Sequence, residues 1–170
     1  MERLMDLKMT PSFLQNHYEL TIEEHGYEFH TDKGIVYFVG FVSYPVVYDF
    51  LSIKTYMFNI DRLSEPDVRE GQDDIKVRNT ILYVIYSFFQ EHQDALITIC
   101  DVMDGKQNAR RRLFDRWFDE FNNGTLIKLD AECDFEETKT FASLIFSSNN
   151  ECAEELKQNF EELKKLNFFN

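Results

Sequence analysis

Residues 95–121, ALITICDVMDGKQNARRRLFDRWFDEF, decide the fold predicted for this chain. The stretch begins with an apolar run, Ala95–Cys100, which is typical of a buried β-strand. A polar segment containing Asp101, Asp104 and Gly105 interrupts the apolar pattern after this run. Apolar residues then recur at the spacing of an amphipathic helix, and one stripe of it carries Ala109, Leu113, Phe114, Trp117, Phe118 and Phe121. A strand, a loop and a helix are therefore predicted here.

Similar patterns elsewhere in the chain predict further strands and helices. Alternating or continuous apolar residues predict strands at residues 18–22, 27–31, 35–44, 53–60, 95–100, 125–131 and 141–147. Apolar residues at helical spacing predict helices at residues 77–89, 109–121 and 148–166. The acidic segment 132–139 is predicted to be a loop, and residues 1–17 an N-terminal extension with a short helix.

These elements predict a single α+β domain over residues 1–170. Their order is β-β-β-β-α-β-α-β-β-α. Strands joined by short turns pair antiparallel, whereas the strand–helix–strand passage from 53–60 to 95–100 predicts one parallel crossover. The expected sheet is therefore mixed and mainly antiparallel.

Composition indicates a globular protein of a reducing compartment. The chain has 6 Gly, 3 Pro and 3 Cys. An odd number of widely spaced cysteines argues against a disulfide framework or a zinc knuckle, and Cys100 is expected to be a buried thiol in an apolar strand. No apolar run reaches the roughly 20 residues of a membrane span, and no secretory signal opens the chain. We therefore expect a cytoplasmic protein that does not enter a membrane.

The charge balance restricts the classes of partner. The chain carries 18 Lys and Arg against 31 Asp and Glu, which gives a formal net charge of -13. Phosphates of nucleic acids are repelled by such a chain, so general nucleic-acid binding is excluded. The charge favours solubility or a basic protein partner.

Positive charge is concentrated at the start of the second predicted helix, where the sequence places Lys106, Arg110, Arg111 and Arg112. Positive charge at this end opposes the helix dipole, so a compensating anion is expected. A bound phosphate or carboxylate is one source of that anion, and the acids of the chain itself are the other.

Ion pairs within the helix are the local alternative to a bound ligand. The four-residue spacing pairs Arg111 with Asp115, and Arg116 with Glu120. Arg110 has no acid at this spacing, and neither does Arg112. These two arginines therefore remain the strongest candidates for binding an external anion.

Asp101 and Asp104 follow the strand at 95–100, at a place where open sheets often bind ligands. Two neighbouring carboxylates can bind a metal or act as a base. Alternatively, Asp104 with Gly105 forms an ordinary turn and Asp101 pairs with an arginine. The histidines lack metal-binding spacing and no catalytic motif occurs, so no catalytic or metal-binding residue is assigned.

Two further expectations concern the helices. Trp117 lies on the apolar stripe and is predicted to be a core residue, so Trp117→Ala is expected to cost about 3–5 kcal/mol. Ser148 and Glu151 have the spacing of a capping box at the start of the last helix.

The segments YEFHTDKG at 27–34 and ICDVMDGKQNARRRLFDRWF at 99–118 carry a first resemblance. They resemble a family of small bacterial proteins, mostly from Bacteroidetes, that is known only as a domain of unknown function. The resemblance covers most of the chain and implies no particular activity.

The order of elements from residue 18 to residue 147 resembles the core of the GNAT family of N-acetyltransferases. In this resemblance strand 53–60 corresponds to the family's splayed strand, and loop 68–73 to the loop that binds the pyrophosphate of coenzyme A. Arg69 and Gly71 are then the cofactor-binding candidates. The resemblance implies an acyltransferase-like fold with acyl-coenzyme A as the cofactor.

The chain departs from the GNAT pattern at two places. Asp73 ends the predicted loop and Asp74 follows it, and their carboxylates disfavour a bound pyrophosphate. Phe114 stands where the family often has a general-acid tyrosine, and a phenyl ring has no proton to give. Standard acetyltransferase chemistry is therefore not expected.

Three functions follow from these observations. The first is binding of an anionic small molecule or an acidic peptide at the Arg-rich helix start, in a cytoplasmic bacterial protein with an acyltransferase-like fold. The second is a protein-binding module, of immunity or antitoxin type, that uses its acidic surface. The third is a divergent acyl-coenzyme A-dependent acyltransferase.

Overall fold

A computed structural model of the chain describes residues 12–44, 54–64, 75–100, 105–135 and 137–165. The described residues form two compact units. Residues up to 39 and from 60 to 90 form the first unit, and residues from 40 to 59 and from 91 onwards form the second. None of the helices among these residues is both long and apolar enough to cross a membrane.

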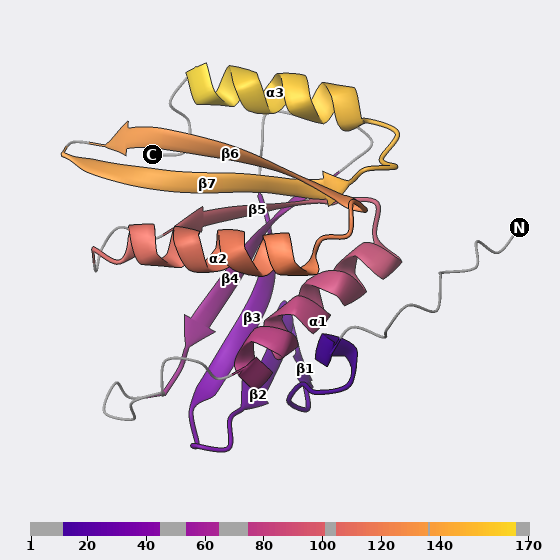
Figure 1. The fold of residues 1–170 in the computed structure, drawn as a ribbon, viewed down its shortest axis with the longest axis vertical. Coiled ribbons are helices and arrows are strands. Elements are labelled where there is room, and N and C mark those ends of the chain that lie inside the picture. Colours follow the sequence, from indigo (N-terminus) through magenta and orange to yellow (C-terminus); the bar gives the residue numbers. More distant parts are fainter. Residues whose placement is uncertain (1–11, 45–53, 65–74, 101–104, 136, 166–170) are drawn as a thin grey trace, which may run out of the picture. The chain divides into compact units, whose positions relative to one another are not determined.

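The order of the elements is the one predicted from the sequence (Figure 1). In chain order they are η1 (Ser12–Leu14), β1 (Thr21–Glu23), β2 (Gly26–His30), β3 (Val36–Ser43), β4 (Thr55–Arg62), α1 (Ile75–Glu91), β5 (Ala95–Cys100), α2 (Gln107–Phe121), β6 (Leu126–Phe135), β7 (Thr138–Ser147) and α3 (Ala153–Lys165). The strand predicted at 95–100 is confirmed residue for residue.

The strands form one sheet with the order β1-β2-β3-β4-β5-β7-β6. β4 and β5 are parallel, and they pair through Thr55, Tyr56 and Met57 with Ala95, Leu96 and Ile97. The pairs β1–β2, β5–β7 and β6–β7 are antiparallel. The prediction of a mixed, mainly antiparallel sheet with one parallel crossover is therefore confirmed.

In the first unit, buried polar groups of α1 hold the chain that precedes β1. The backbone N–H of Tyr18 donates to Thr80 Oγ1 at 2.9 Å, and Asn79 Nδ2 donates to the carbonyl of Asn16 at 3.0 Å. Of the helix expected within residues 1–17, the described part is the short 3-10 turn η1, which buries Phe13. Residues 1–11 lie outside the described part of the chain.

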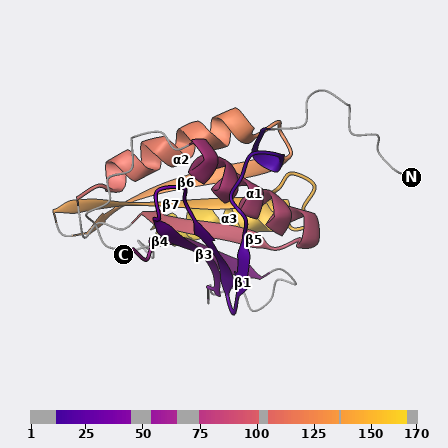
Figure 2. The same cartoon turned by 90° about the horizontal axis from the view of Figure 1, so that it is seen from below.

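In the second unit, strands β5, β7 and β6 present an apolar face to α3. Figures 1 and 2 show α3 on one face of these strands and α2 on the other. Because side chains alternate along a strand, every second residue faces α3. The core on that side contains Ala95, Ile97, Ala131, Cys133, Ala142, Leu144, Phe146, Leu156, Phe160 and Leu163.

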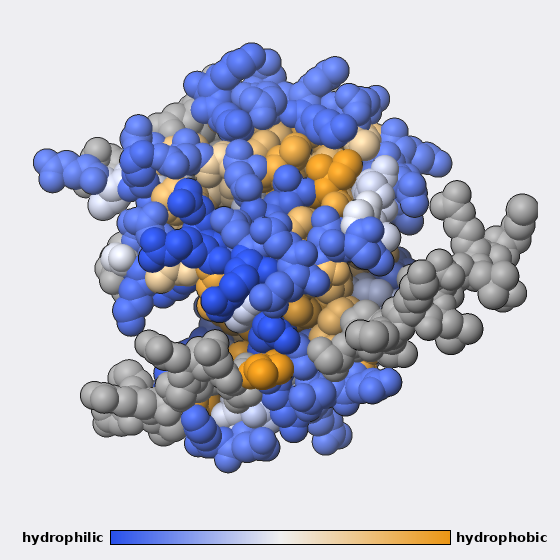
Figure 3. Space-filling view, in the orientation of Figure 1, coloured by the Kyte–Doolittle hydropathy of each residue, from blue (hydrophilic) through white to orange (hydrophobic). Residues whose placement is uncertain are grey.

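α3 is amphipathic, as its sequence period predicts. Leu156, Phe160 and Leu163 recur at helical spacing and are buried against the sheet. Its other side is covered by hydrophilic side chains, visible at the top of Figure 3. Acids in its first turn and lysines in its last turn complement the helix dipole.

The predicted acidic loop at 132–139 is wrong. β6 continues to Phe135, β7 begins at Thr138, and these two residues pair across the hairpin. Asp and Glu have low strand propensity, which is why the segment resembles a loop in the sequence. Pairing with the apolar strand β7 overrides that local preference. The longer strand brings Glu132 opposite Phe141.

The predicted capping box at Ser148 and Glu151 is also wrong. α3 begins at Ala153, and Ser148 is exposed. The buried Asn150 takes the capping role instead, because its Oδ1 accepts the N–H of Cys152 at 2.9 Å. Its Nδ2 donates to the carbonyl of Gln93 at 2.8 Å, which ties the helix start to the loop before β5.

Asn150→Ala is expected to lower the free energy of unfolding by about 1–3 kcal/mol, because it removes the cap and leaves the Gln93 carbonyl without its donor. Ser148→Ala, two residues away and exposed, is the matched control and should change stability by less than about 0.5 kcal/mol. Urea unfolding followed by far-UV circular dichroism measures both. Equal effects of the two substitutions would contradict the assignment of the cap.

Candidate anion-binding site

Among the residues that the structure describes, no side chain caps the start of α2, and the first turn of the helix contains no acidic residue. The N-cap position is Lys106, and the first helical hydrogen bond runs from the N–H of Arg110 to the carbonyl of Lys106 at 3.0 Å. The N–H groups of the first turn therefore have no acceptor within the helix. Free N–H groups and the positive end of the helix dipole favour an anion at this position.

The structure places three of the four predicted basic residues on the surface at this helix start. Lys106, Arg110 and Arg112 are exposed, whereas Arg111 is half-buried. Arg112 makes no ion pair with any residue that the structure describes. The other predicted site residues, Asp101, Asp104, Arg69 and Gly71, lie outside the described residues, as do Asp73 and Asp74.

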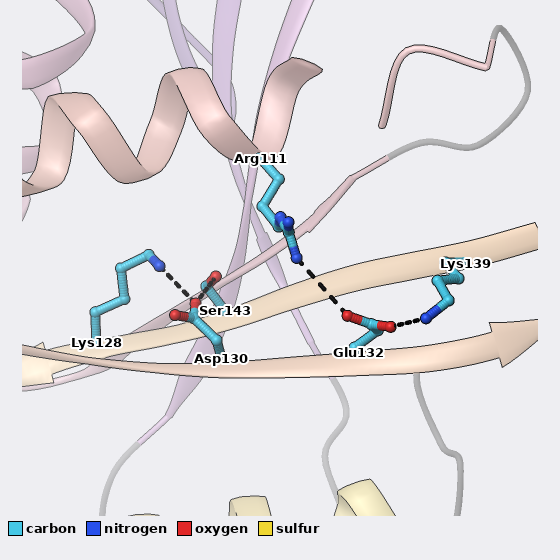
Figure 4. Close-up of polar contacts among 6 residues, drawn as sticks. All are labelled: Arg111, Lys128, Asp130, Glu132, Lys139 and Ser143. Atoms are coloured by element: carbon cyan, nitrogen blue, oxygen red, sulfur yellow. Dashed lines mark hydrogen bonds and ion pairs between the residues drawn. The ribbon is translucent and has the colours of Figure 1, made fainter. Parts of the chain in front are cut away.

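Arg111 is directed toward the sheet and does not form the predicted pair with Asp115. Its guanidinium lies over the ring of Phe141, 4.2 Å from the centroid, and its Nη1 is 3.7 Å from Glu132 Oε2 (Figure 4). Glu132 also accepts a hydrogen bond from Lys139, and this bond holds the pKa of the Glu132 carboxyl below its ordinary value. Arg111 therefore attaches α2 to the β6–β7 hairpin. The sequence did not reveal this partner because Glu132 was assigned to a loop.

A second polar cluster under α2 was missed by the sequence reasoning. Lys128 Nζ donates to Asp115 Oδ1 at 2.7 Å and to Asp130 Oδ1 at 2.5 Å, and Ser143 Oγ donates to Asp130 at 2.6 Å. The Lys128 side chain is only 7% exposed. Lys128, Asp130 and Glu132 alternate along β6, so a correct strand assignment would have placed them on one face.

Burial and hydrogen bonding shift the pKa of Lys128 in opposite directions. Removal from water alone would lower the pKa of its ammonium group, but the hydrogen bonds to Asp115 and Asp130 outweigh it. The pKa of Lys128 is therefore raised above its ordinary value. The charged lysine forms ion pairs with two carboxylates from different elements and so connects α2 to β6.

Cys100, at the end of β5, is half-exposed and not the buried thiol that was expected. Partial burial raises the pKa of this thiol, while the nearby charges of Arg110, Arg111 and Lys128 act in the opposite direction. These charges place both arginines close to the end of β5. Cys100, Cys133 and Cys152 are free thiols in the structure.

Gln107, the first residue of α2, is the buried residue of that helix and was not singled out from the sequence. It is 8% exposed, and its Oε1 has no hydrogen-bond partner among the described residues. A buried amide oxygen without a partner costs free energy. No local pattern distinguishes such a residue, because its burial depends on how α2 lies on the sheet.

The prediction that Trp117 is a core residue is wrong. Trp117 is half-buried, as are Phe114, Phe118 and Phe121, and Leu113 is exposed. The sheet face beneath α2 is mixed, because the polar side chains of Lys128, Asp130 and Ser143 lie there beside the buried apolar side chains of Phe141 and Ile145. Ion pairs and contacts between cations and rings are therefore part of what holds α2 on the sheet.

The sheet order and the basic helix start define an α+β protein with a mixed seven-stranded sheet and a candidate anion site on one of its covering helices. The chain belongs to a family of unknown function (DUF6169), which matches residues 73–162. This match confirms the resemblance to a domain of unknown function, and it spans the site from β5 through α2 to β7. No curated protein and no solved structure matches the chain.

Proposed function

We propose that the chain binds an anionic small molecule at the start of α2, through Lys106, Arg110 and Arg112. The observation that carries the proposal is the first turn of α2, which contains basic and neutral residues but no acid and is capped by no described side chain. Free N–H groups and guanidinium groups both prefer phosphate or carboxylate oxygens as acceptors. The proposal retains the expectation of a cytoplasmic bacterial protein.

The division of roles among the arginines supports this proposal. Arg111 is occupied by Phe141 and Glu132 and serves to hold the helix on the sheet. The exposed Arg110 and Arg112 lie one residue to either side of it and extend from a helix that is held in place. Anchoring the helix reduces the entropy lost when the neighbouring side chains bind a ligand.

The ligand class is tested by isothermal titration with inorganic phosphate, pyrophosphate, citrate and acetyl-coenzyme A at constant ionic strength. We expect saturable binding of at least one of these anions to the unmodified chain. Arg110→Glu should weaken that binding about 10- to 100-fold, because a charge-assisted hydrogen bond is replaced by a repulsive carboxylate. Arg112→Glu should act in the same direction.

Arg116→Glu is the matched control for these substitutions. Arg116 is exposed on the same helix, makes no ion pair with a described residue, and lies beyond the first turn. The substitution makes the same change in net charge, so equal loss with Arg116→Glu would indicate a general electrostatic effect. Absence of binding for all four anions at millimolar concentration would refute the proposal.

Acyl-coenzyme A is a second candidate ligand, and the pairing of β4 with β5 supports it. The two parallel strands are paired at three positions near their beginnings, and the described residues beyond Met57 and Ile97 are not paired with each other. Separation of these two strands is the feature that the GNAT resemblance implies for cofactor binding. Tighter binding of acetyl-coenzyme A than of pyrophosphate would favour this candidate, whereas equal affinity would favour a simple anion site.

A further inference from the structure

β6 is the last strand of the sheet, and its outer edge carries no strand among the described residues. On its inner edge it pairs with β7 along its whole length, from Leu126 opposite Ser147 to Phe135 opposite Thr138. An outer edge exposes a row of backbone donors and acceptors that can pair with another extended chain. β6 is ten residues long, and every second residue turns its backbone groups toward this outer edge.

The side chain of Asn122 shows which backbone groups point outward. Its Nδ2 donates to the carbonyl of Leu126 at 2.9 Å, and its Oδ1 accepts the N–H of Leu126 at 3.2 Å. Thr125 is directed the other way, because its carbonyl accepts the N–H of Ser148 at 2.9 Å. Backbone groups alternate along an antiparallel strand, so those of Lys128, Asp130 and Glu132 point outward with Leu126.

The side chains beside this edge differ between the two faces of the strand. On the α2 face, the Asp130 side chain is 60% exposed and that of Glu132 is 44% exposed. Lys128 is turned inward to its two aspartates and offers no charge at the surface. On the α3 face, Ile127 and Leu129 are half-buried at the rim of the core. Asp130 is paired with Lys128, and Glu132 with Arg111 and Lys139, so what this face offers a basic group is the exposed outer side of two carboxylates that are already paired. The other face of the edge is apolar.

We propose that the outer edge of β6 binds an extended peptide in which basic and apolar residues alternate. Backbone hydrogen bonds to Lys128, Asp130 and Glu132 would add the peptide as an eighth strand beside β6. Its basic side chains lie opposite Asp130 and Glu132, where opposite charges across a strand pair are favourable. Its apolar side chains lie beside Ile127 and Leu129. This role is separate from anion binding at the start of α2.

A second copy of the chain is the occupant that the charges disfavour. Two β6 strands related by a two-fold axis at Asp130 would place Asp130 opposite its own copy. An axis at Ala131 would place Asp130 opposite Glu132 of the other copy. Like charges directly opposite in a strand pair are destabilising. Charges at an edge strand are a common protection against such self-pairing.

The test uses a fluorescein-labelled peptide of alternating lysine and valine, with fluorescence anisotropy as the measure of binding. A peptide of the same composition with its lysines and valines in two blocks is the sequence control. We expect the alternating peptide to bind at least about tenfold more tightly, because only it can direct every lysine to the acidic face. Equal affinity of the two peptides, or no binding at millimolar concentration, would overturn the proposal.

Amide hydrogen exchange tests where the peptide lies. In the free chain the amides of Asp130 and Glu132 should exchange fast, and those of Leu129 and Ala131 slowly, because only the latter pair with β7. Added peptide should protect Asp130 and Glu132. Binding without protection at these two residues would overturn the proposal. Protection that rises with protein concentration in the absence of peptide would overturn it in favour of a second copy.

A charge reversal tests the recognition of basic residues. Glu132→Lys should weaken binding of the lysine–valine peptide about three- to tenfold and strengthen binding of a glutamate–valine peptide. Glu154→Lys, an exposed residue of α3, makes the same charge change away from the edge and is the matched control. Equal weakening by both variants would mean that net charge, and not the edge of β6, attracts the peptide.

Discussion

Phe160→Ala is expected to lower the free energy of unfolding of the second unit by about 3–5 kcal/mol. Phe160 lies on α3, is 1% exposed, and packs in the core between this helix and strands β6 and β7. Removing its ring leaves a cavity that close-packed neighbours fill only in part. Urea unfolding followed by the fluorescence of Trp117, the only tryptophan of the chain, reports on this unit.

Trp117→Ala provides the comparison for this prediction. Its ring is larger than that of Phe160, but it is only half-buried, so we expect a loss of only about 1–2 kcal/mol. Far-UV circular dichroism follows the unfolding of this variant, which lacks the fluorescent residue. A loss as large as that of Phe160→Ala would show that α2 is buried more deeply in solution than the structure indicates.

Lys128→Met is expected to destabilise the second unit by about 2–3 kcal/mol, although methionine fits the length of the lysine chain. The substitution leaves Asp115 and Asp130 close together without the cation that both contact. Removing one partner from a fully buried pair costs about 3–5 kcal/mol, and partial exposure of both aspartates reduces that cost. α2 should lose protection from hydrogen exchange, whereas α3 should keep it.

The pH dependence of this effect has a definite sign. The pKa of Lys128 is raised in the folded chain, so its stabilising contribution is complete below the ordinary value of 10.5. The contribution disappears as the pH rises through the raised pKa. The difference in unfolding free energy between the unmodified chain and Lys128→Met should therefore be constant from pH 7 to 10 and shrink above about 10.5.

Lys157→Met is the control for the lysine substitution. Lys157 pairs with Glu154 on the exposed side of α3, and such pairs contribute at most about 0.5 kcal/mol. A destabilisation by Lys157→Met as large as that by Lys128→Met would contradict the special role of the buried lysine. A difference that keeps its full size at pH 11 would mean that Lys128 acts through packing and not through its charge.

The features predicted correctly from the sequence are those that depend on local pattern. The apolar run 95–100 is encoded by its own residues. The end of α2 before Asn122 and Gly124 is of the same kind. The extension of β6 and β7 into segment 132–139 was missed because pairing with β7 overrides the low strand propensity of its acids. The Asn150 cap was missed because the burial of Asn150 and its bond to the Gln93 carbonyl depend on a distant part of the chain.

The same division applies to the candidate site. The cluster from Lys106 to Arg112 is visible in the sequence because its members are adjacent. The direction of Arg111, the burial of Gln107 and the contacts of Lys128 are not, since they follow from the placement of α2 on one face of the sheet. Intrahelical spacing suggested Asp115 for Arg111, but the sheet supplies each of them with a different partner.

Different interactions hold α2 and α3 on the two faces of the sheet, so ionic strength should affect the two helices differently. α3 is held by apolar contacts, which do not weaken when salt is added. α2 is held partly by the exposed pair of Arg111 with Glu132, which dissolved ions screen. Added salt should therefore loosen the helix that carries the anion site while the layer under α3 remains intact. Affinities measured for this site are comparable only at one fixed salt concentration.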